Sequence, residues 1–554
     1  MCLMGPFDAA SDFSYARHIM GDTKHGLAIP GTSRRGFIAG GAALGLAGAA
    51  RIGASQESAA AAIRAAAAKV DLALVNGQFV DHRGIVGDTL TIANGRIAYV
   101  GLGIDLDPSL PRVDLGGRTV IPGLVDAHVH YTRAGVNPGY QERRVERAFS
   151  IAALQQTLAN RAASVPRGEF ITCIGGWNHR QFAESRRPTR AELDDAAPDH
   201  AVYLSGTGGG TGAITNSRGA GFFAARGIDV DPATGVVASA RDAFAALQAE
   251  QTDEDRLRGT ADLNAYASSV GLTTVVNAGN FDDQRYPLAL WREGRLDVRM
   301  RPLFPADSPA EVEARAANNF AQAGRAVGDD LYRPAGFGER IGGTNTMSDQ
   351  LEPTARMIAR HGWLLQQHSI SSVENAFHLG IFERIAREFP IDSLHWALIH
   401  LQEISAEHLQ ALGSLGAGAS AQTWTYLSDS GGPPFRRIVD SGIPAAVGTD
   451  STNVSALDPW LTLFYMTTGR NLAGEMTNDG QQISRAQALE LYTLGAAWFC
   501  FEGDNVGSFE PGKLADLAVL SENYLTASEE GLRSIDSVLT LVGGRVVHAA
   551  APFA

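Results

Sequence analysis

Short segments of alternating apolar and polar residues stand near both ends of the chain. Residues 70–101, VDLALVNGQFVDHRGIVGDTLTIANGRIAYVG, consist of such segments and contain two Asn-Gly pairs. An Asn-Gly pair between alternating segments is typical of a β-hairpin. Residues 512–525 and 534–549 repeat the pattern. The sequence therefore predicts one small β-sandwich formed from both ends, with residues 70–122 as its first part and residues 501–550 as its second.

The long middle of the chain alternates short apolar runs with helical segments. Besides the opening run at residues 122–132, the candidate strands are residues 170–176, 201–206, 273–279, 298–304, 334–339, 363–369, 395–401, 416–423 and 443–451. Strands that alternate with helices favour a parallel α/β barrel, here at residues 123–500. A barrel of eight strands needs fewer candidates than these. We therefore expect one or two of them to belong to an insertion at about residues 160–240.

Residues 1–55 have the features of an export leader. Arg34 and Arg35 precede a run of small apolar residues, FIAGGAALGLAGAA. This order is typical of a twin-arginine signal, whose cargo crosses the membrane in folded form. An amphipathic or membrane-spanning helix is the alternative, but the apolar run is short for a span. We therefore expect a periplasmic or secreted protein with no stable membrane span after the leader is removed.

Composition narrows the partners that the chain can have. The 554 residues are 45% hydrophobic and 19% charged, which is ordinary for a globular protein. The formal net charge of -14 argues against nucleic acid or an anionic membrane surface as a main partner. Three cysteines cannot form a disulfide framework. We expect a small-molecule substrate as the partner, and a homo-oligomer is compatible with the sequence. Met1 and Met20 are both candidate first residues, because the stretch before the arginine pair is long for a signal.

The candidate chemistry begins in the run PGLVDAHVHYT at residues 122–132. Asp126, His128 and His130 alternate along a strand and so point to one face. Three polar side chains on one face of an apolar strand need a partner there, because unpaired buried polar groups are costly. A single histidine is more often a satisfied core residue, whereas two at strand spacing favour a pair of metal ligands. A metal ion is one partner that this face could bind.

Four more metal-competent side chains fall at or near the ends of later strands. They are Glu339, His368, His400 and Asp450. In a parallel α/β barrel the active site lies at the C-terminal ends of the strands. Each residue has an ordinary explanation when taken alone: a helix cap for the carboxylates and a structural role for the histidines. Together with the His-x-His pair they come from five strands, which is hard to attribute to chance.

Several motifs occur in one order from about residue 70 to residue 547 and resemble a known family. They are PGLVDAHVH, GGWNHRQFAESRRPTRAELDDAAPDHAVYL, GLTTVVNAG, QQHS, LIHLQEIS, AAVGTDS and VGSFEPGKLADLAVL. In these motifs the chain is similar to the amidohydrolase superfamily of metal-dependent hydrolases, in its YtcJ-like branch. The resemblance implies an α/β fold, a distorted (β/α)8 TIM-type barrel with a small β-sandwich. It also implies hydrolysis of amide, formamide or related C–N bonds with one or two divalent metals, often zinc.

The resemblance implies a role for each candidate ligand. Carried over by position, His128 and His130 bind the more buried metal. His368 and His400 bind the more exposed one. Asp450 contacts the buried metal and is the catalytic group that accepts and delivers protons. The metal activates a water molecule and polarises the scissile carbonyl.

The chain departs from the family at the bridge between the two metals. Many members use a carboxylated lysine, but no lysine lies between Lys69 and Lys513. Glu339 stands near the expected position, and its two oxygens suit divalent ions. Cys173 is the alternative bridge, although its apolar strand favours a buried structural thiol. A single metal with no bridge is the third reading, and we favour Glu339.

Four further residues have weaker links to the site. Asp126 lies on the same face as the His-x-His pair and is expected to orient an imidazole N–H. Thr211 stands where the family has a histidine, a change that we expect to affect substrate contacts more than the metal site. His395 and Trp424 could line the pocket or be structural.

Other functions remain open at the level of sequence. The same metal site could hydrolyse a lactone or another ester, or decarboxylate a substrate. A non-catalytic exported binding or scaffold protein on an inherited barrel is the alternative from another class. The run GTGGGTGA resembles a dinucleotide fingerprint only weakly, and the sequence has no G-x-S-x-G elbow.

Overall fold

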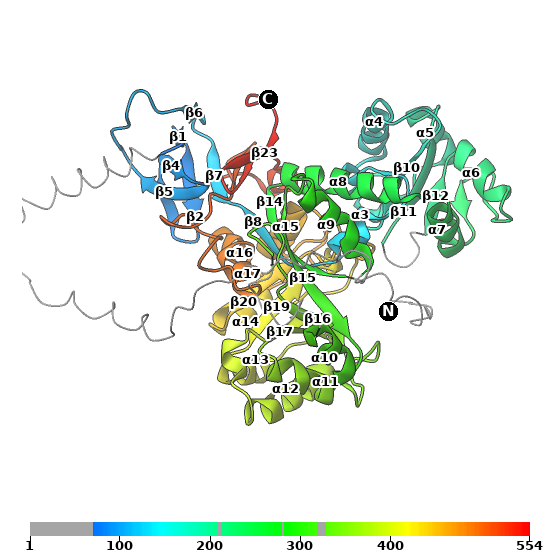
Figure 1. Ribbon diagram of the computed structural model, residues 1–554. Helices are drawn as coiled ribbons and strands as arrows, with labels where there is room; N and C mark the ends of the chain where they lie inside the picture. The colour runs from blue at the N-terminus through cyan, green and yellow to red at the C-terminus, as the bar shows by residue number, and fades with distance from the viewer. Residues whose placement is uncertain (1–69, 208–211, 280–281, 318–327) are drawn as a thin grey trace, which may run out of the picture. The chain divides into compact units, whose positions relative to one another are not determined.

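The structure is a computed structural model that describes residues 70–207, 212–279, 282–317 and 328–554 (Figure 1). The predicted export leader and Thr211 lie outside these ranges. The described residues belong to one compact unit, Arg64–Ala554. In this part of the chain, no helix has the length and hydrophobicity that crossing a bilayer requires.

Eight parallel strands form the central sheet. In chain order they are β8 (Leu124–Val129), β14 (Leu272–Ala278), β15 (Arg299–Ala306), β16 (Gly336–Ile341), β17 (Leu364–Ser369), β18 (Ala397–His400), β19 (Gly418–Gln422) and β20 (Ala445–Gly448), and each pairs with the next. Hydrogen bonds join the two outer strands at their ends. The N–H of Asp450 donates to the carbonyl of His128 at 2.9 Å, and the N–H of His130 donates to the carbonyl of Ser451 at 2.6 Å. The sheet thus closes into the predicted TIM-type barrel.

Helices follow most of the barrel strands. They are α3 (Tyr131–Gly135), α8 (Asp253–Ser269), α9 (Arg285–Arg292), α10 (Pro309–Ala317), α11 (Leu351–Arg360), α12 (Ser372–Ala386), α13 (Ala406–Ser414), α14 (Phe435–Asp440), α15 (Pro459–Thr468), α16 (Arg485–Leu491) and α17 (Leu494–Trp498). The N-terminus of α12 illustrates how the sequence starts them. Ser371 and Glu374 form a capping box, in which each side chain accepts from the backbone N–H of the other. On the buried face of α12, the ring of Phe382 lies 4.9 Å from the ring of Trp396, next to β18.

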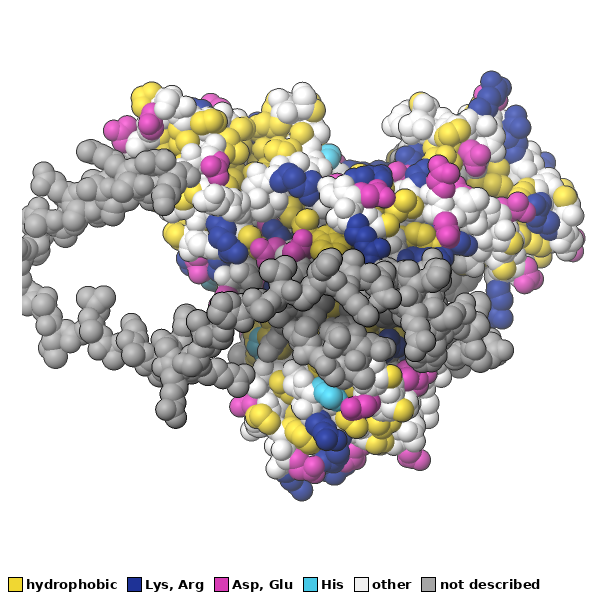
Figure 2. Space-filling model, in the orientation of Figure 1, with side chains coloured by type: hydrophobic (Ala, Val, Ile, Leu, Met, Phe, Trp, Pro, Cys, Tyr) yellow, Lys and Arg dark blue, Asp and Glu magenta, His cyan; other side chains and the backbone are white. Residues whose placement is uncertain are grey.

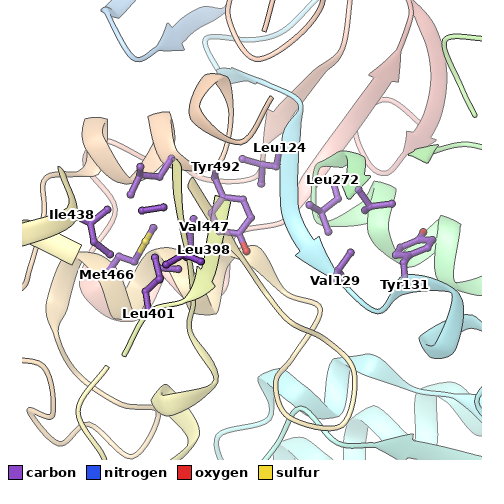
Figure 3. Close-up of a cluster of buried hydrophobic side chains, with 14 of the residues drawn as sticks. Leu124, Val129, Tyr131, Leu272, Leu398, Leu401, Ile438, Val447, Met466 and Tyr492 are labelled. Atoms are coloured by element: carbon purple, nitrogen blue, oxygen red, sulfur yellow. The ribbon is translucent and has the colours of Figure 1, made fainter. Parts of the chain in front are cut away.

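One large apolar cluster supports the barrel (Figure 3). Leu398 on β18 and Val447 on β20 are completely buried, as are Leu124 and Val129 on β8. Met466 on α15 belongs to the same cluster and is also completely buried. Burying a side chain of this size contributes roughly 1.5–3 kcal/mol to stability. This packing stabilises the positions of the strands, which carry the candidate ligands at their C-terminal ends.

Two sheets pack together into the predicted β-sandwich. One has the order β5 (Arg96–Gly101), β4 (Thr89–Ala93), β1 (Leu72–Val75) and β6 (Arg112–Asp114); the other has the order β23 (Arg545–Ala549), β22 (Ser537–Val542), β21 (Leu517–Leu520), β7 (Thr119–Pro122), β2 (Gln78–Asp81) and β3 (Gly84–Gly87). The short helix α18 (Glu529–Leu532) lies between β21 and β22 in the chain. Leu74 and Phe79 from the first part share one buried cluster with Leu517 and Leu541 from the second. Both ends of the described chain therefore contribute to one small domain.

A further sheet explains the surplus of candidate strands. Its order is β13 (Val236–Val237), β12 (Ala213–Thr215), β11 (Ala201–Ser205), β10 (Phe170–Ile174) and β9 (Tyr140–Gln141), with helices η1 (Arg143–Arg147), α4 (Ile151–Ala162), α5 (Arg190–Ala196), α6 (Ser217–Ala224) and α7 (Ala240–Ala249) in the same stretch. Two of the ten candidate strands belong here and eight to the barrel. The sheet begins near residue 140, earlier than the predicted start near residue 160. The reason is that β9 has only two residues, which give no apolar run to recognise.

The further sheet is tied to the loop that follows β20. The hydroxyl of Thr452 donates to the carbonyl of Ile174 at 2.9 Å. The hydroxyl of Thr207 donates to the carbonyl of Asn453 at 2.6 Å. Both contacts lie within three residues of Asp450, so the extra sheet helps to fix the end of the last barrel strand.

Candidate metal centre

The six candidate ligands meet at the C-terminal end of the barrel. His128 lies on β8 and His130 follows that strand, Glu339 lies on β16, His368 on β17, His400 ends β18, and Asp450 follows β20. Parallel strands of a closed barrel all end on the same face, which brings distant residues together. The sequence placed these residues at strand ends, and the barrel register makes them neighbours.

His128, His130 and Asp450 form one group whose candidate ligand atoms lie within 4.8 Å of one another. Nε2 of His130 is 3.2 Å from Oδ1 of Asp450, and Nε2 of His128 is 3.6 Å from the same oxygen. The His128 side chain is completely buried, and that of His130 is 15% exposed. Both imidazoles of the His-x-His pair therefore face one carboxylate, as the alternation along the strand predicted.

Glu339 lies between two pairs of histidines. Its Oε2 is 3.0 Å from Nε2 of His130 and 3.8 Å from Nε2 of His128. Its Oε1 is 2.7 Å from Nδ1 of His368 and 3.4 Å from Nε2 of His400. Each carboxylate oxygen thus faces a different pair of imidazoles, which is the arrangement that a carboxylate bridge between two cations requires.

The later pair of histidines packs closely. The rings of His368 and His400 lie 4.1 Å apart, and Nδ1 of His400 is 3.9 Å from Oδ2 of Asp450. His128, Glu339 and His400 form a second group of candidate ligands, which overlaps the first at His128. His368 falls outside both groups and reaches the centre through Glu339.

The surroundings of the two carboxylates of the centre favour their ionised form. Burial opposes the charge of Glu339, but His130 and its hydrogen bonds hold the pKa of this carboxyl well below its usual range. Burial likewise opposes the charge of Asp450, and the nearby imidazoles of His128 and His130 hold its pKa far below the ordinary value. Two anionic groups in a buried site favour a bound cation.

The histidines respond to the same charges. Burial and the charge of Arg133 lower the pKa of His130, but Glu339 and Asp450 outweigh them and raise it to about 9. Burial, with the nearby His368, lowers the pKa of His400 to about 4. A neutral imidazole is the form that binds a metal. The position of His130 favours positive charge, and His400 is already in the ligating form.

Two nitrogen atoms test whether the residues fit a metal ion. Nδ1 of His130 lies 2.5 Å from the carbonyl oxygen of Ala278. A carbonyl only accepts, so this nitrogen carries the hydrogen and leaves Nε2 to face the carboxylates. Nε2 of His128 is buried and has no hydrogen-bond partner among the described residues. A cation held by these nitrogens and the carboxylates would satisfy all of them, so the donor set fits a divalent metal.

Cys173 lies in a different environment from the centre. It is on β10 of the further sheet, in an apolar cluster with Ile171, Trp177 and Leu204. Its sulfur is 3.6 Å from the carbonyl oxygen of Gly175, and burial raises the pKa of the thiol well above the usual value. The structure thus separates the two candidate bridges, with Glu339 in the centre and Cys173 in a hydrophobic core.

Asp126 does not orient an imidazole, contrary to the sequence-based expectation. Its carboxylate accepts hydrogen bonds from the N–H of Thr449 at 3.0 Å and from the hydroxyl of Thr449 at 2.5 Å. It also accepts from the backbone N–H of His128 at 3.2 Å. The ring nitrogen Nδ1 of His128 instead lies 3.4 Å from Oε1 of Gln366. Asp126 faces the correct side of β8, but it fixes backbone rather than a ring.

Of the two residues that could line the pocket, Trp424 lies at the centre and His395 does not. The ring of Trp424 lies 5.2 Å from that of His400, so this tryptophan packs against the centre. His395 stacks between Trp498 and Phe501, with ring centroids 4.0 and 4.1 Å away. His395 therefore belongs to the packing beneath the barrel strands rather than to the centre.

Two arginines at the centre were missed by the sequence analysis. Arg133 lies three residues after His130, and Arg340 directly follows Glu339. Arginine is abundant in this chain, and neither residue belongs to a quoted motif. Their proximity to predicted ligands is the one signal that could have singled them out.

Comparison with known proteins decides the family. Residues 112–548 match a family model described as "Amidohydrolase family". The chain belongs to the amidohydrolase family. This amidohydrolase is therefore a metal-dependent hydrolase of C–N bonds.

Known relatives of this amidohydrolase align over most of its length. N-substituted formamide deformylase of Arthrobacter pascens is 21% identical over 541 residues, covering 86% of this chain and 97% of that protein. Putative amidohydrolase YtcJ of Bacillus subtilis (strain 168) is 20% identical over 501 residues, covering 80% and 91%. These similarities confirm the predicted family and its YtcJ-like branch.

Solved structures of the same fold also exist. The crystal structure of an uncharacterized metal-dependent hydrolase from Pyrococcus horikoshii OT3 has a TM-score of 0.56 with 21% sequence identity. The similarity covers 83% of this chain and 99% of that one. At this identity the comparison supports the fold, which agrees with the barrel described above.

Proposed function

We propose that this amidohydrolase cleaves the C–N bond of a small amide or formamide, with Asp450 as the group that moves the proton. The observation that carries the proposal is the position of Asp450. Its carboxylate faces both imidazoles of the His-x-His pair and lies at the end of the last barrel strand. A carboxylate in this place can accept a proton from water on one side and deliver it to a leaving amine on the other.

The residues of the centre would hold a divalent ion, and zinc suits their nitrogen and oxygen donors. His128, His130 and Asp450 would bind one ion. When bound, a divalent metal acidifies water and polarises the scissile carbonyl. The chain itself fixes the geometry: the carbonyl of Ala278 sets the tautomer of His130, and Gln366 contacts the ring of His128.

We propose that the centre would hold two divalent ions and that Glu339 would be a ligand available to both. Two cations held close together repel, so an anionic group between them stabilises the pair. Glu339 offers one oxygen to His128 and His130 and the other to His368 and His400. No lysine lies between Lys69 and Lys513, so a lysine carbamate cannot form in the barrel. The carboxylate of Glu339 would take the place of the carbamate between the two ions.

Export in folded form is the cellular part of the proposal. It rests on the sequence alone, on Arg34 and Arg35 and the small apolar run that follows them. A protein that binds its metal in the cytoplasm and then crosses the membrane needs a route for folded chains. We propose the twin-arginine route and a periplasmic or secreted location.

The test is a substrate panel run on protein with measured metal content. Simple N-substituted formamides and amides are compared with esters, lactones and carboxylic acids. We expect turnover of the C–N substrates, loss of turnover after treatment with a chelator, and recovery after zinc is added. Turnover confined to esters or lactones, or release of carbon dioxide, would contradict the proposal.

Two histidine variants make the test specific. His130→Ala removes a ligand and should lower metal content and turnover together. His361→Ala is the matched control, because His361 is 26% exposed and pairs with Glu313, away from the centre. A folded barrel that never retains metal and turns over nothing would instead favour the scaffold alternative.

A further inference from the structure

One buried glutamine reaches the ring of His128 from the opposite side of the barrel. Gln366 lies on β17, which stands opposite β8 in the strand order of the closed sheet. Gln366 and His368 are two residues apart on one strand, so both side chains point to the same face. Gln366 is completely buried, as is His128. Its amide is therefore part of the packed interior next to the candidate ligands.

The contacts of Gln366 allow one orientation of its amide. Its Nε2 donates to the backbone carbonyl of Ala127 at 3.3 Å, and its Oε1 lies 3.4 Å from Nδ1 of His128. A carbonyl oxygen only accepts, so the nitrogen of the amide faces Ala127 and the oxygen faces His128. The amide oxygen also only accepts. Nδ1 of a neutral His128 ring therefore carries the hydrogen.

A hydrogen on Nδ1 leaves the other ring nitrogen of His128 available to a cation. Nε2 is buried without a hydrogen-bond partner among the described residues, and it lies 3.6 Å from Oδ1 of Asp450. In a neutral imidazole only the nitrogen without a hydrogen has a free lone pair for a metal. The tautomer that Gln366 favours is thus the one that the candidate centre needs.

The two rings of the His-x-His pair are fixed by different kinds of acceptor. Nδ1 of His130 lies against the backbone carbonyl of Ala278, an acceptor that does not depend on the side chain at position 278. Nδ1 of His128 instead lies against a side chain, which a substitution can remove. Gln366 is therefore a position at which the sequence controls the tautomer of a candidate ligand.

The acceptor is neutral although carboxylates are abundant in this chain. The chain has 60 Asp and Glu residues, and acidic and basic side chains are interspersed on the face in Figure 2. The centre itself already contains two carboxylates, Glu339 and Asp450. A third negative charge would be costly to bury beside them while no cation is bound. An amide fixes the ring of His128 without adding that charge.

We infer that Gln366 is a positioning residue for the metal centre, which holds the hydrogen of His128 on Nδ1 and so presents Nε2 to a divalent ion. The inference rests on the proposed function, which supplies the metal. It adds a residue that sets the affinity for the metal without being one of the candidate ligands. Acceptors that orient a ligating histidine typically account for about 10- to 100-fold in metal affinity.

The zinc affinity of two variants, measured by competition with a chelator, tests the inference. Gln366→Met keeps an unbranched side chain of similar length and removes the amide oxygen. Its dissociation constant for zinc should rise about 10- to 100-fold. Gln366→Glu keeps an oxygen at the same place and adds negative charge, so its dissociation constant should stay at or below that of the wild-type protein. If Gln366 only filled space, the order would be reversed, because methionine suits a buried site better than a carboxylate.

Gln367→Met is the matched control, because Gln367 is the neighbouring glutamine on β17 and is also completely buried. Its amide contacts backbone instead of a ring. Oε1 accepts from the N–H of Ile341 at 3.4 Å, and Nε2 donates to the carbonyl of His368 at 3.3 Å. We expect its dissociation constant for zinc to stay close to that of the wild-type protein.

The outcomes separate this inference from the proposed function. An unchanged dissociation constant in Gln366→Met, or an equally large loss of affinity in Gln366→Glu, overturns the inference and leaves the metal centre standing. If the wild-type protein binds no zinc, the proposed metal centre fails and the inference fails with it. If Gln366→Met does not fold, Gln366→Glu decides alone: zinc binding as tight as in the wild-type protein or tighter supports the inference, and weaker binding overturns it.

Discussion

Asp450 holds its carboxylate in place through a backbone conformation that most residues avoid. Its φ is 56°, in the left-handed region, and its N–H donates to the carbonyl of His128. Oδ1 then lies 3.2 Å from Nε2 of His130, and Oδ2 lies 3.9 Å from Nδ1 of His400. A carboxylate fixed in this way can contact a metal and still reach a proton on bound water.

Asp450→Asn tests the proton-transfer role of this residue. Asparagine has nearly the same shape and tolerates a left-handed φ, so the backbone should not change. It is a poor base, and we expect kcat to fall about a hundredfold or more, the usual scale for the loss of general acid–base help. The measurement is kcat at matched metal content. A nearly normal kcat would place the base on another residue.

Glu339 and Cys173 allow a direct comparison of the two candidate bridges. Glu339→Gln removes the negative charge between the histidine pairs, and we expect the metal stoichiometry and the turnover to fall sharply. Cys173→Ser is the matched control, because its sulfur lies in the apolar cluster of the further sheet. It should keep its metal and most of its turnover. Metal analysis by mass spectrometry decides, and a larger loss in Cys173→Ser would reverse the assignment.

At the scale of elements, one buried carboxylate connects the further sheet to the barrel. Glu146 lies on η1, and its Oε2 accepts from the N–H of Leu457 at 3.1 Å. Its Oε1 accepts from Arg143 at 3.0 Å. Burial outweighs the effects of Arg143 and of the Leu457 N–H and raises the pKa of Glu146 to about 8. Leu457 follows the loop after β20, so the protonation of Glu146 bears on the same loop that positions Asp450.

Glu146 makes stability depend on pH in a direction that can be stated. An unfolded glutamate has a pKa of about 4.5, below the native value of about 8. Between these values the native state keeps a proton that the unfolded chain releases, so the free energy of unfolding falls as pH rises from about 4.5 to about 8. In Glu146→Gln this part of the slope should disappear. Denaturant titrations at about pH 5 and about pH 8 measure it.

A surface variant provides the comparison for the pH experiment. Glu388 is 56% exposed, and Glu388→Gln should keep the slope of the wild-type protein. If Glu146→Gln retains the full slope as well, the titrating group lies elsewhere in the fold.

The elements that could be predicted from sequence are those whose signal is local. The eight barrel strands are apolar runs with clear breaks, and both parts of the β-sandwich are alternating apolar and polar segments. The spacing of His128 and His130 fixes their common face. The role of Asp126 could not be predicted, because alternation along a strand shows to which face a side chain points but not which residue it contacts on that face. Thr449, from the opposite edge of the closing sheet, supplies that neighbour. The start of the further sheet at β9 was missed for want of any apolar run.

The polar residues that contact the ligands could not be predicted from the sequence either. Gln366 contacts His128, and Arg133 lies against the loop after β20, across hundreds of residues of chain. Such contacts depend on how strands close into a barrel, which no pattern along the chain records.

At the scale of the whole molecule, the predicted export leader is open to a direct test. Replacing Arg34 and Arg35 together by lysine keeps the charge and removes the arginine pair, and we expect the protein to accumulate in the cytoplasm. Cell fractionation with immunodetection measures this. Arg51→Lys is the control and should be exported normally. Undiminished export of the double variant would contradict a twin-arginine route.

The closure of the barrel also dictates an order of events during synthesis. His128 leaves the ribosome early, whereas Asp450, which completes the same ligand group, appears near the end of translation. β7 remains unpaired on one edge for even longer, because its antiparallel partner β21 is synthesised after the whole barrel. A nascent or truncated chain therefore exposes unpaired strand edges, which are prone to aggregation. The metal can therefore bind to its complete set of ligands only late in the synthesis of the protein. A chain that lacks its last strands has an incomplete β-sandwich, in which the edge of β7 that pairs with β21 is exposed.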